Sequence, residues 1–399
     1  MSKKVYITGL GIISAIGNSV TENYKNLCAG ISGISKLTSI KSTLQKPVGE
    51  IKLSNNQLVE LLQLDSKKEF SRTSLLGMFA AKQAVENAKI SDISEFKTGL
   101  ISATTVAGMT ETEFYYKKNL KPETLEKYIE THEPADSTEK IADFLGISDF
   151  MTTISTACSS SANAIMNGAR MIKHGLLDRA VVGGTDALSK FTLNGFNTLQ
   201  ILDNENCKPF DENRKGLNLG EAAAFLVLES EEIVKQKNKK ILAEISGYAN
   251  ANDAYHQTAS SPEGHGAFLA MNQALKLANI NPHNIDYVNV HGTGTANNDL
   301  SESKAMIKLF NGKVPKFSST KSFTGHTLAA AGAVEAVFSV LSIQNNVIFP
   351  NLNFQTPIKE TNLAPEIKTI KNFEIKNVLS NSFGFGGNGT ALIFSKIKF

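Results

Sequence analysis

The chain has 399 residues, of which 41% are hydrophobic and 20% are charged, a composition typical of a globular protein with a sizeable core. Its formal net charge of +3 gives nucleic-acid binding no electrostatic support. The cysteines Cys28, Cys158 and Cys207 are far apart and form no CxxC pair, which argues against disulfides or a zinc site. No apolar run approaches the roughly 20 residues of a membrane span. We therefore expect a cytoplasmic protein.

The N-terminal stretch predicts a β-strand at residues 4–8, followed by a turn at Gly9-Leu10-Gly11. These glycines imitate a dinucleotide-binding loop, but helix signals begin only around Thr21. A second such pattern, at residues 384–389, has no room for the helix and the ribose-binding acid that a dinucleotide site needs. A nicotinamide-dependent oxidoreductase is therefore a weak alternative.

Further along the chain, helical spacing is expected at residues 74–89 and a strand at about 98–103. Residues 110–140 are polar and are expected to form a cap or an oligomer contact. The charged segment 230–240 is expected to be a solvated linker, after which a second round of elements begins. The remaining expected strands are 180–184, 225–228, 241–246, 287–291, 316–319, 378–380 and 391–395, with helices at 266–278, 300–310 and 327–344.

Cys158 lies where a predicted strand, ending at Thr153-Ile154, gives way to a helix that runs to about His174. The N-terminus of a helix carries roughly half a positive charge, which would lower the thiol pKa and favour the reactive thiolate. A buried structural cysteine is the commoner role of a lone intracellular cysteine. Position alone therefore leaves both roles open.

The two halves of the sequence echo each other. Small residues from Cys158 to Ala162 open one helix, and small residues from Thr327 to Ala333 open another, directly after His326. Such residues would let two helices approach closely across a pseudo-two-fold axis. The echo predicts an internally duplicated α/β unit.

Three stretches carry residues suited to chemistry. His291 follows an apolar strand, Lys321 and His326 precede the second small-residue helix, and Phe383 and Phe385 lie in a Gly-rich loop. Ligands gather at the carboxyl ends of strands in α/β folds. A cysteine nucleophile, backbone N–H donors and two neutral imidazoles suit acyl transfer through a thioester, with an enolate formed by decarboxylation of a malonyl thioester.

On these motifs the sequence resembles the β-ketoacyl-acyl carrier protein synthases, elongating condensing enzymes of the thiolase-like superfamily, over nearly its whole length. The resemblance implies an α/β thiolase-like fold of two pseudo-symmetric halves, residues 1–235 and 236–399, in five α-β-α-β-α layers. The motifs that carry it are Val5–Gly11, Thr156–Ser160, Gly183–Asp186, Lys208–Asp211 with Gly216 and Gly220–Ala222, His291–Thr295 with Asp299 and Glu302, Lys321–His326 and Asn381–Gly387.

The resemblance also implies roles for individual residues. Cys158 is the implied nucleophile, and His291 and His326 are the pair for malonyl decarboxylation and condensation. Lys321 is the implied buried lysine that organises the site electrostatically, with Glu335 as its partner.

Other implied roles concern the substrate path. Thr293 and Thr295 match positions that bind the phosphopantetheine arm. Phe385 matches the gating aromatic, whose backbone N–H is the second oxyanion donor, and Phe383 would line the same entrance. The sequence departs from the family at Asn388, where Thr is usual.

The implied reaction is the decarboxylative Claisen condensation of a Cys158-bound acyl chain with malonyl-acyl carrier protein in type II fatty acid biosynthesis. The substrates are carried on phosphopantetheine, and no other cofactor is implied. The alternative is a ketosynthase dedicated to an aryl-polyene or polyketide pathway, paired with a chain-length-factor-like partner instead of forming a homodimer. The Cys-His-His set argues against initiating synthases and thiolases, and retention of Cys158 argues for an active subunit.

Acyl carrier proteins are acidic, so basic residues at the pocket mouth are candidates for docking them. Lys67, Lys68 and Arg72 lie where the family places such residues, and Lys208 is a further candidate, as are Arg214 and Lys215. The alternative for Lys67 and Lys68 is a solvated helix face.

Overall fold

A computed structural model describes residues 3–65, 69–116 and 130–397 of the protein. Its centre is a ten-stranded sheet with the strand order β10-β9-β13-β14-β8-β1-β7-β6-β4-β5. The strands of the first half are β1 (Val5–Ser14), β4 (Thr98–Ala103), β5 (Phe150–Ile154), β6 (Arg179–Asp186) and β7 (Ala222–Ser230). Those of the second half are β8 (Ala243–Asn252), β9 (Tyr287–Asn289), β10 (Lys316–Ser318), β13 (Asn377–Phe383) and β14 (Asn388–Ser395).

The two halves of this sheet have the same topology. In each half three strands run parallel, β5-β4-β6 and β10-β9-β13, and two antiparallel strands complete the half, β7-β1 and β14-β8. The halves meet where β1 pairs with β8, at Tyr6 opposite Glu244 and Ile7 opposite Ala243. The predicted internal duplication is therefore confirmed. Two small sheets, β2 (Ile34–Lys36) with β3 (Pro47–Gly49) and β11 (Val347–Ile348) with β12 (Ile370–Lys371), lie outside this plan.

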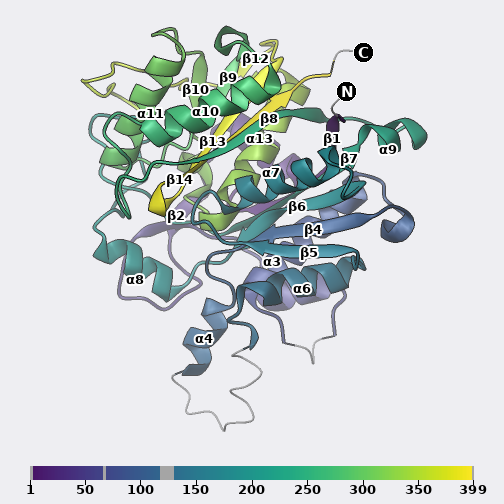
Figure 1. Ribbon diagram of the computed structural model, residues 1–399. Coiled ribbons are helices and arrows are strands. Elements are labelled where there is room, and N and C mark those ends of the chain that lie inside the picture. Colours follow the sequence, from purple (N-terminus) through teal and green to yellow (C-terminus); the bar gives the residue numbers. More distant parts are fainter. Residues whose placement is uncertain (1–2, 66–68, 117–129, 398–399) are drawn as a thin grey trace.

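Helices cover the sheet in layers, as Figure 1 shows. Helices α3 (Arg72–Asn87) and α6 (Pro134–Leu145) pack on one side of the first half, and α10 (His265–Ala278) with α11 (Ala296–Leu309) lies on the far side of the second. Between the halves lie α7 (Ser160–Lys173) and α13 (Ala331–Asn345), each in contact with strands of both. This is the expected five-layered α-β-α-β-α arrangement. The other helices are α1 (Val20–Ala29), α2 (Asn55–Leu61), α4 (Met109–Tyr116), α8 (Lys190–Thr198), α9 (Glu231–Gln236) and α12 (Lys321–Thr324).

The two central helices approach each other as closely as their small residues allow. A methyl group placed on Gly332 would lie 2.8 Å from the Cβ atom of Ala162, closer than real Cβ contacts come. The backbone N–H of Ala333 donates to the Ser161 hydroxyl at 2.9 Å. The predicted close packing of the helices that begin near Cys158 and after His326 is thus present.

The turn predicted at Gly9 and Gly11 is wrong, because both glycines lie inside β1. The reason is the packing of α3 against this strand. An added Cβ atom would lie 2.2 Å from the Ala84 carbonyl oxygen at Gly9, and 1.9 Å from the Ala80 carbonyl oxygen at Gly11. The glycines serve contact between helix and strand, and the oxidoreductase alternative loses the phosphate loop on which it rested.

Two expectations for polar segments also need correction. Of residues 110–140, residues 117–129 lie outside the described structure, and residues 134–140 form the first part of α6, which packs against α3 and β5. Ser137 and Thr138 are buried there, so this part belongs to a core layer. The expected linker at 230–240 contains α9, whose Ile233 and Val234 are buried. The predicted boundary between the halves, at residues 235 and 236, falls inside α9 and stays a prediction.

Contrary to the expectation from the sequence, residues Leu328–Asn345, which include α13, are long and apolar enough to cross a membrane by length and composition alone. However, 89% of this stretch is buried inside the described structure. A helix enclosed on all sides is apolar all round because it lies in the core. α13 is therefore the central core helix of the fold.

Candidate active site

Cys158 lies on a tight connection between β5 and α7. The preceding residue, Ala157, has φ of 52°, a left-handed conformation that is uncommon outside glycine. This bend turns the chain from the strand into the helix and leaves Cys158 7% exposed at the wall of a pocket of about 270 Å³. His291, His326 and Phe385 line the same pocket. The structure thus brings these residues, which are far apart in the sequence, into one pocket.

The thiol of Cys158 is protonated at neutral pH. Burial raises its pKa to about 11, while the charge of Lys321 and the backbone N–H groups of Phe385 and Cys158 lower it by less. The expectation of a lowered thiol pKa is therefore wrong, because loss of hydration outweighs the favourable groups around the sulfur. The N–H groups of Phe385 and Cys158 therefore both lie within hydrogen-bond reach of the sulfur.

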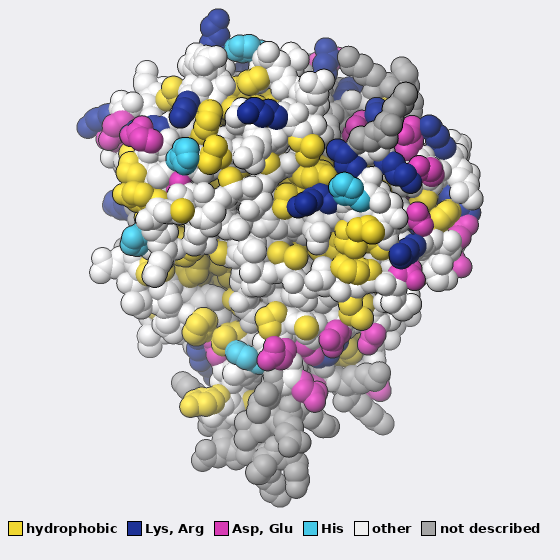
Figure 2. Space-filling model, viewed as in Figure 1, with side chains coloured by type: hydrophobic (Ala, Val, Ile, Leu, Met, Phe, Trp, Pro, Cys, Tyr) yellow, Lys and Arg dark blue, Asp and Glu magenta, His cyan; other side chains and the backbone are white. Residues whose placement is uncertain are grey.

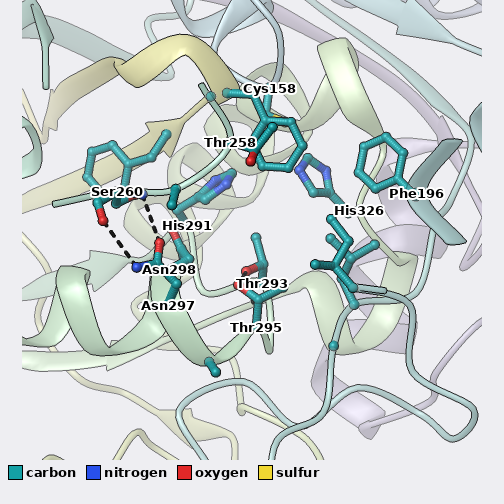
Figure 3. A pocket seen from close by; sticks show the side chains of 18 of the residues that line it. Cys158, Phe196, Thr258, Ser260, His291, Thr293, Thr295, Asn297, Asn298 and His326 are labelled. Carbon is teal, nitrogen blue, oxygen red and sulfur yellow. Dashed lines mark hydrogen bonds between the residues drawn. The ribbon is translucent and has the colours of Figure 1, made fainter. Parts of the chain in front are cut away.

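The two histidine rings face each other edge to face beside Cys158, with centroids 5.4 Å apart (Figure 3). His326 Nδ1 accepts a hydrogen bond from the Leu328 backbone N–H at 3.2 Å, so its proton lies on Nε2. His291 Nδ1 lies 3.3 Å from the Lys321 ammonium, which can only donate, so its proton also lies on Nε2. Burial, and secondly the charge of Lys321, holds the pKa of both rings well below the ordinary value. The pocket therefore has two neutral Nε2–H donors.

Lys321 is buried and fully satisfied by three acceptors. Its ammonium donates to the Glu335 carboxylate, to the His291 carbonyl oxygen at 2.6 Å and to His291 Nδ1 at 3.3 Å. The side chains of Lys321 and Glu335 are only 3% and 2% exposed. Burial raises the pKa of Glu335 to about 7, with Lys321 acting in the opposite direction. The pair fixes the orientation of the His291 ring.

Two carboxylates on α11 hold the loop that carries His291. Glu302 accepts the backbone N–H groups of His291 and Gly292, each at 2.9 Å, and Asp299 accepts that of Thr293 at 3.0 Å. Burial raises the pKa of Glu302 to about 7. No role for these carboxylates was predicted from the sequence, although their spacing of three residues near the start of a helix places both over the loop.

The residues expected to bind pantetheine lie farther along the same pocket. The hydroxyls of Thr293 and Thr295 are 2.9 Å apart, and both residues line the pocket. In Figure 3 they lie away from Cys158, on the side of Asn297, which exchanges two hydrogen bonds with Ser260. The pocket is therefore a channel with a reactive end and a polar end.

Two aromatic residues of the Gly-rich loop flank the reactive end. The Phe383 ring lies 5.8 Å from that of His291, and Phe385 stacks on Phe196 at 6.0 Å. Phe196 comes from α8 and was missed by the sequence analysis, since its helix carried no motif. Phe385, the predicted gating residue, therefore contacts α8.

The residues predicted to dock the carrier differ in their exposure and contacts. The Arg72 side chain is only 12% exposed, and its guanidinium forms an ion pair with Glu221 and donates to the Ile51 and Leu53 carbonyls. These contacts argue against its assignment to carrier docking, which stays a prediction. Lys208 remains at the surface but pairs with Glu205 at 3.1 Å. Lys67 and Lys68 lie outside the described residues.

The remaining two candidates also differ. Arg214 donates to the carbonyls of Asp211, Thr295 and Ala296 and serves the backbone, whereas Lys215 is exposed and lines the pocket. Figure 2 shows acidic side chains gathered over α6, which contains the exposed Glu139 and Asp143. That helix is a poor surface for an acidic carrier.

Comparison with known proteins identifies the family of the chain. Residues 2–233 match the β-ketoacyl synthase N-terminal domain, and residues 242–355 match the C-terminal domain of the same family. The chain is 33% identical to 3-oxoacyl-[acyl-carrier-protein] synthase 2 of Staphylococcus aureus, covering 100% of this chain and 99% of the relative. It is also 33% identical to the enzyme of that name from Coxiella burnetii, with 99% of both chains covered.

Solved structures resemble the fold closely. The ishigamide ketosynthase/chain length factor superposes with a TM-score of 0.94 at 27% identity, over 100% of both chains. A ketosynthase in complex with its chain length factor from Xenorhabdus doucetiae has a TM-score of 0.87 at 31% identity, over 99% of this chain and 98% of the other. The chain therefore belongs to the β-ketoacyl synthase family and is a condensing acyltransferase.

Proposed function

We propose that Cys158, His291 and His326 carry out a decarboxylative condensation in two stages, on substrates carried by an acyl carrier protein. The observation that carries this proposal is the convergence of a cysteine thiol, two neutral Nε2–H donors and two backbone N–H donors on one pocket. Four donors and one nucleophile match the needs of acyl transfer followed by enolate formation.

In the first stage the sulfur of Cys158 attacks the carbonyl carbon of an acyl thioester. The backbone N–H groups of Cys158 and Phe385 stabilise the tetrahedral oxyanion. The carbon–sulfur bond to the carrier breaks, and the carrier thiol leaves with the proton that Cys158 gives up. The acyl chain is then bound to Cys158.

In the second stage a malonyl thioester occupies the channel. Its carbon–carbon bond breaks, carbon dioxide leaves, and the electron pair remains as an enolate whose oxygen accepts from His291 and His326. The enolate carbon attacks the acyl carbon, and the Cys158 sulfur departs and takes up a proton. Apart from the carrier's phosphopantetheine, the proposed reaction uses no cofactor.

The proposed assembly contains an acyl carrier protein and a second, related subunit. Among similar solved structures, one is a polyketide acyl-carrier protein in complex with its ketosynthase, and another is a ketosynthase in complex with its chain length factor. In this chain β5 is the last strand of the described sheet, and Met151 on it is 45% exposed. An apolar strand edge favours pairing with another subunit. The widely spaced cysteines favour a cytoplasmic location.

The second candidate is a polyketide or aryl-polyene ketosynthase that works with a chain-length-factor partner. The high structural similarity to the ishigamide ketosynthase/chain length factor, with a TM-score of 0.94, favours it. In both candidates the reaction at Cys158 is the same. They differ in the acyl chain and in the identity of the second subunit.

The test is mass spectrometry of the protein after incubation with a panel of acyl-carrier substrates. We expect one acyl group on Cys158 and none in the Cys158→Ala variant. Cys158→Gln, which cannot be acylated, should still release carbon dioxide from malonyl-carrier, and His291→Ala or His326→Ala should impair that release. Acylation of the Cys158→Ala variant would contradict the proposal. The preferred acyl chain and the subunit composition of the purified complex distinguish the two candidates.

A further inference from the structure

The pocket that contains Cys158 has a single formally charged side chain in its wall. Among the described lining residues, Cys158 carries its proton at neutral pH and the two histidines are neutral, which leaves Lys215 as the one ion. No aspartate or glutamate lines the described pocket wall. The charge of Lys215 is thus not paired with a carboxylate of the described pocket wall.

The backbone on both sides of Lys215 is tied to the loop of the pantetheine threonines. The Gly216 N–H donates to the Gly294 carbonyl oxygen at 3.0 Å. The Arg214 guanidinium donates to the carbonyl oxygens of Thr295 at 3.1 Å and Ala296 at 2.6 Å. Because these contacts flank it, Lys215 projects from a fixed position next to Thr293 and Thr295.

The ammonium of Lys215 is free to bind a ligand. The side chain is exposed, and it makes no hydrogen bond or ion pair with any described residue. The Lys215 charge acts weakly on Glu205. The pKa of Glu205 is lowered mainly by the hydrogen bond and charge of Lys208, and less by Lys215. Glu205 is already paired with Lys208 at 3.1 Å, so Lys215 is left available.

The chemistry of the proposed substrate supplies a partner for this charge. A thioester carried on phosphopantetheine has its reacting carbonyl at one end, two amides in the middle and a phosphodiester anion at the other end. Cys158, Thr293, Thr295 and Lys215 all line the pocket, and Figure 3 shows the two threonines away from Cys158. Lys215 is exposed, and the hydrogen bonds of Arg214 and Gly216 hold its backbone against the threonine loop. The reacting carbonyl and the phosphodiester anion of such a substrate therefore each have a partner in one pocket, Cys158 and Lys215.

We propose that Lys215 binds the phosphodiester that joins the pantetheine arm to its carrier. This rests on the proposed function, and it gives Lys215 a role in substrate binding that is separate from contact with the carrier surface. A charge-assisted hydrogen bond to phosphate fits an ammonium held at one place on a rigid backbone.

The test compares acyl-pantetheine with acyl-4′-phosphopantetheine, two small substrates that differ by the phosphate group. We expect the wild type to show a kcat/KM for the phosphorylated substrate roughly two- to fivefold higher, the size typical of one exposed charged contact. Lys215→Gln should bring the ratio close to one, Lys215→Glu should invert it, and Lys215→Arg should preserve it. The ratio in the wild type should fall as salt is added, and that in Lys215→Gln should not.

Lys276, exposed on α10 in the outer layer, is the matched control, and Lys276→Gln should keep the wild-type ratio. Acyl-carrier protein is a third substrate, and Lys215→Gln should raise its KM by a similar factor. An unchanged ratio in Lys215→Gln and Lys215→Glu would overturn the inference. Failure of the wild type to acylate Cys158 with any of the three substrates would instead overturn the proposed function.

Discussion

The side-chain oxygen of Asn388 accepts a hydrogen bond from the hydroxyl of Ser159 at 2.7 Å, which ties the Gly-rich loop to the residue after the nucleophile. The same oxygen accepts from the amides of Asn163 at 3.0 Å and Asn250 at 2.8 Å. The Asn388 carbonyl oxygen accepts the Gly384 N–H at 2.9 Å, which closes the loop that carries Phe385. Asn388 thus positions the Phe385 N–H relative to Cys158.

Replacing Asn388 by Thr should slow acylation of Cys158. A threonine hydroxyl is too short to accept from all three donors, so the loop that presents the Phe385 N–H loses its anchor. Removal of a whole oxyanion donor costs about 10²–10³ in kcat, and a displaced donor should cost about tenfold. Single-turnover acylation measures the rate, and the KM for acyl-pantetheine should stay near the wild-type value. An unchanged acylation rate would show that the loop is held by its other contacts.

Replacing Glu335 by Ala should destabilise the protein and impair decarboxylation. The buried Lys321 ammonium would lose its only carboxylate partner in the described structure, a change that costs about 3–5 kcal/mol for buried pairs. Denaturant unfolding measures the loss. Carbon dioxide release by Cys158→Gln with and without Glu335→Gln tests the catalytic part, since Gln can still accept from Lys321. Equal stability of Glu335→Ala and the wild type would contradict the assigned pairing.

Decarboxylation by Cys158→Gln should not decline as pH falls through about 6.5, the ordinary imidazole pKa. Burial holds the pKa of both histidines well below that value, so both remain neutral donors. The unfolded chain takes up these protons near pH 6.5 and the folded chain does not, so the free energy of unfolding should fall as the pH drops below 6.5. A rate profile with a midpoint near 6.5 would show that a histidine titrates as if exposed.

Alkylation of Cys158 by iodoacetamide should accelerate steadily as the pH rises from 7 toward 10. Only the thiolate reacts, and burial raises the pKa of this thiol to about 11. Mass spectrometry of the Cys158 peptide at each pH measures the rate. A plateau reached below pH 8 would mean that the helix terminus and Lys321 outweigh burial.

Arg72→Ala should lower stability without a specific effect on the carrier. The Glu221 carboxylate would be left buried without its guanidinium, at a cost of about 3–5 kcal/mol. The ratio of kcat/KM for acyl-carrier protein to that for acyl-pantetheine should match the wild type in the folded fraction. A selective loss with the carrier substrate would restore Arg72 to the docking surface.

Regular periodicity was enough to predict many of the elements. The strand expected at 98–103 is β4 with those bounds, and the helix expected at 266–278 is α10, because local patterns of apolar residues set both. Gly9 and Gly11 were misassigned, since the helix that requires them begins some sixty residues later. Local sequence does not contain that contact.

Some features of the site could likewise be predicted from the sequence, and others could not. Cys158, His291 and His326 could be picked out by motif and resemblance, and the structure brings them to one pocket. The pKa of Cys158 and the burial of Arg72 could not be predicted, since both depend on how much water the finished fold excludes. The Asn388 contacts join three separate parts of the chain, and no spacing in the sequence reports them.

The close contact of Gly332 with Ala162 limits the substitutions that this protein can accept during evolution. α7 begins directly after Cys158, and α13 begins shortly after His326. The separation between nucleophile and proton donor is therefore set by the spacing between two helices from different halves. A larger side chain on either helix would widen the catalytic site itself. At this contact neither half can accept a larger side chain without a compensating change in the other half.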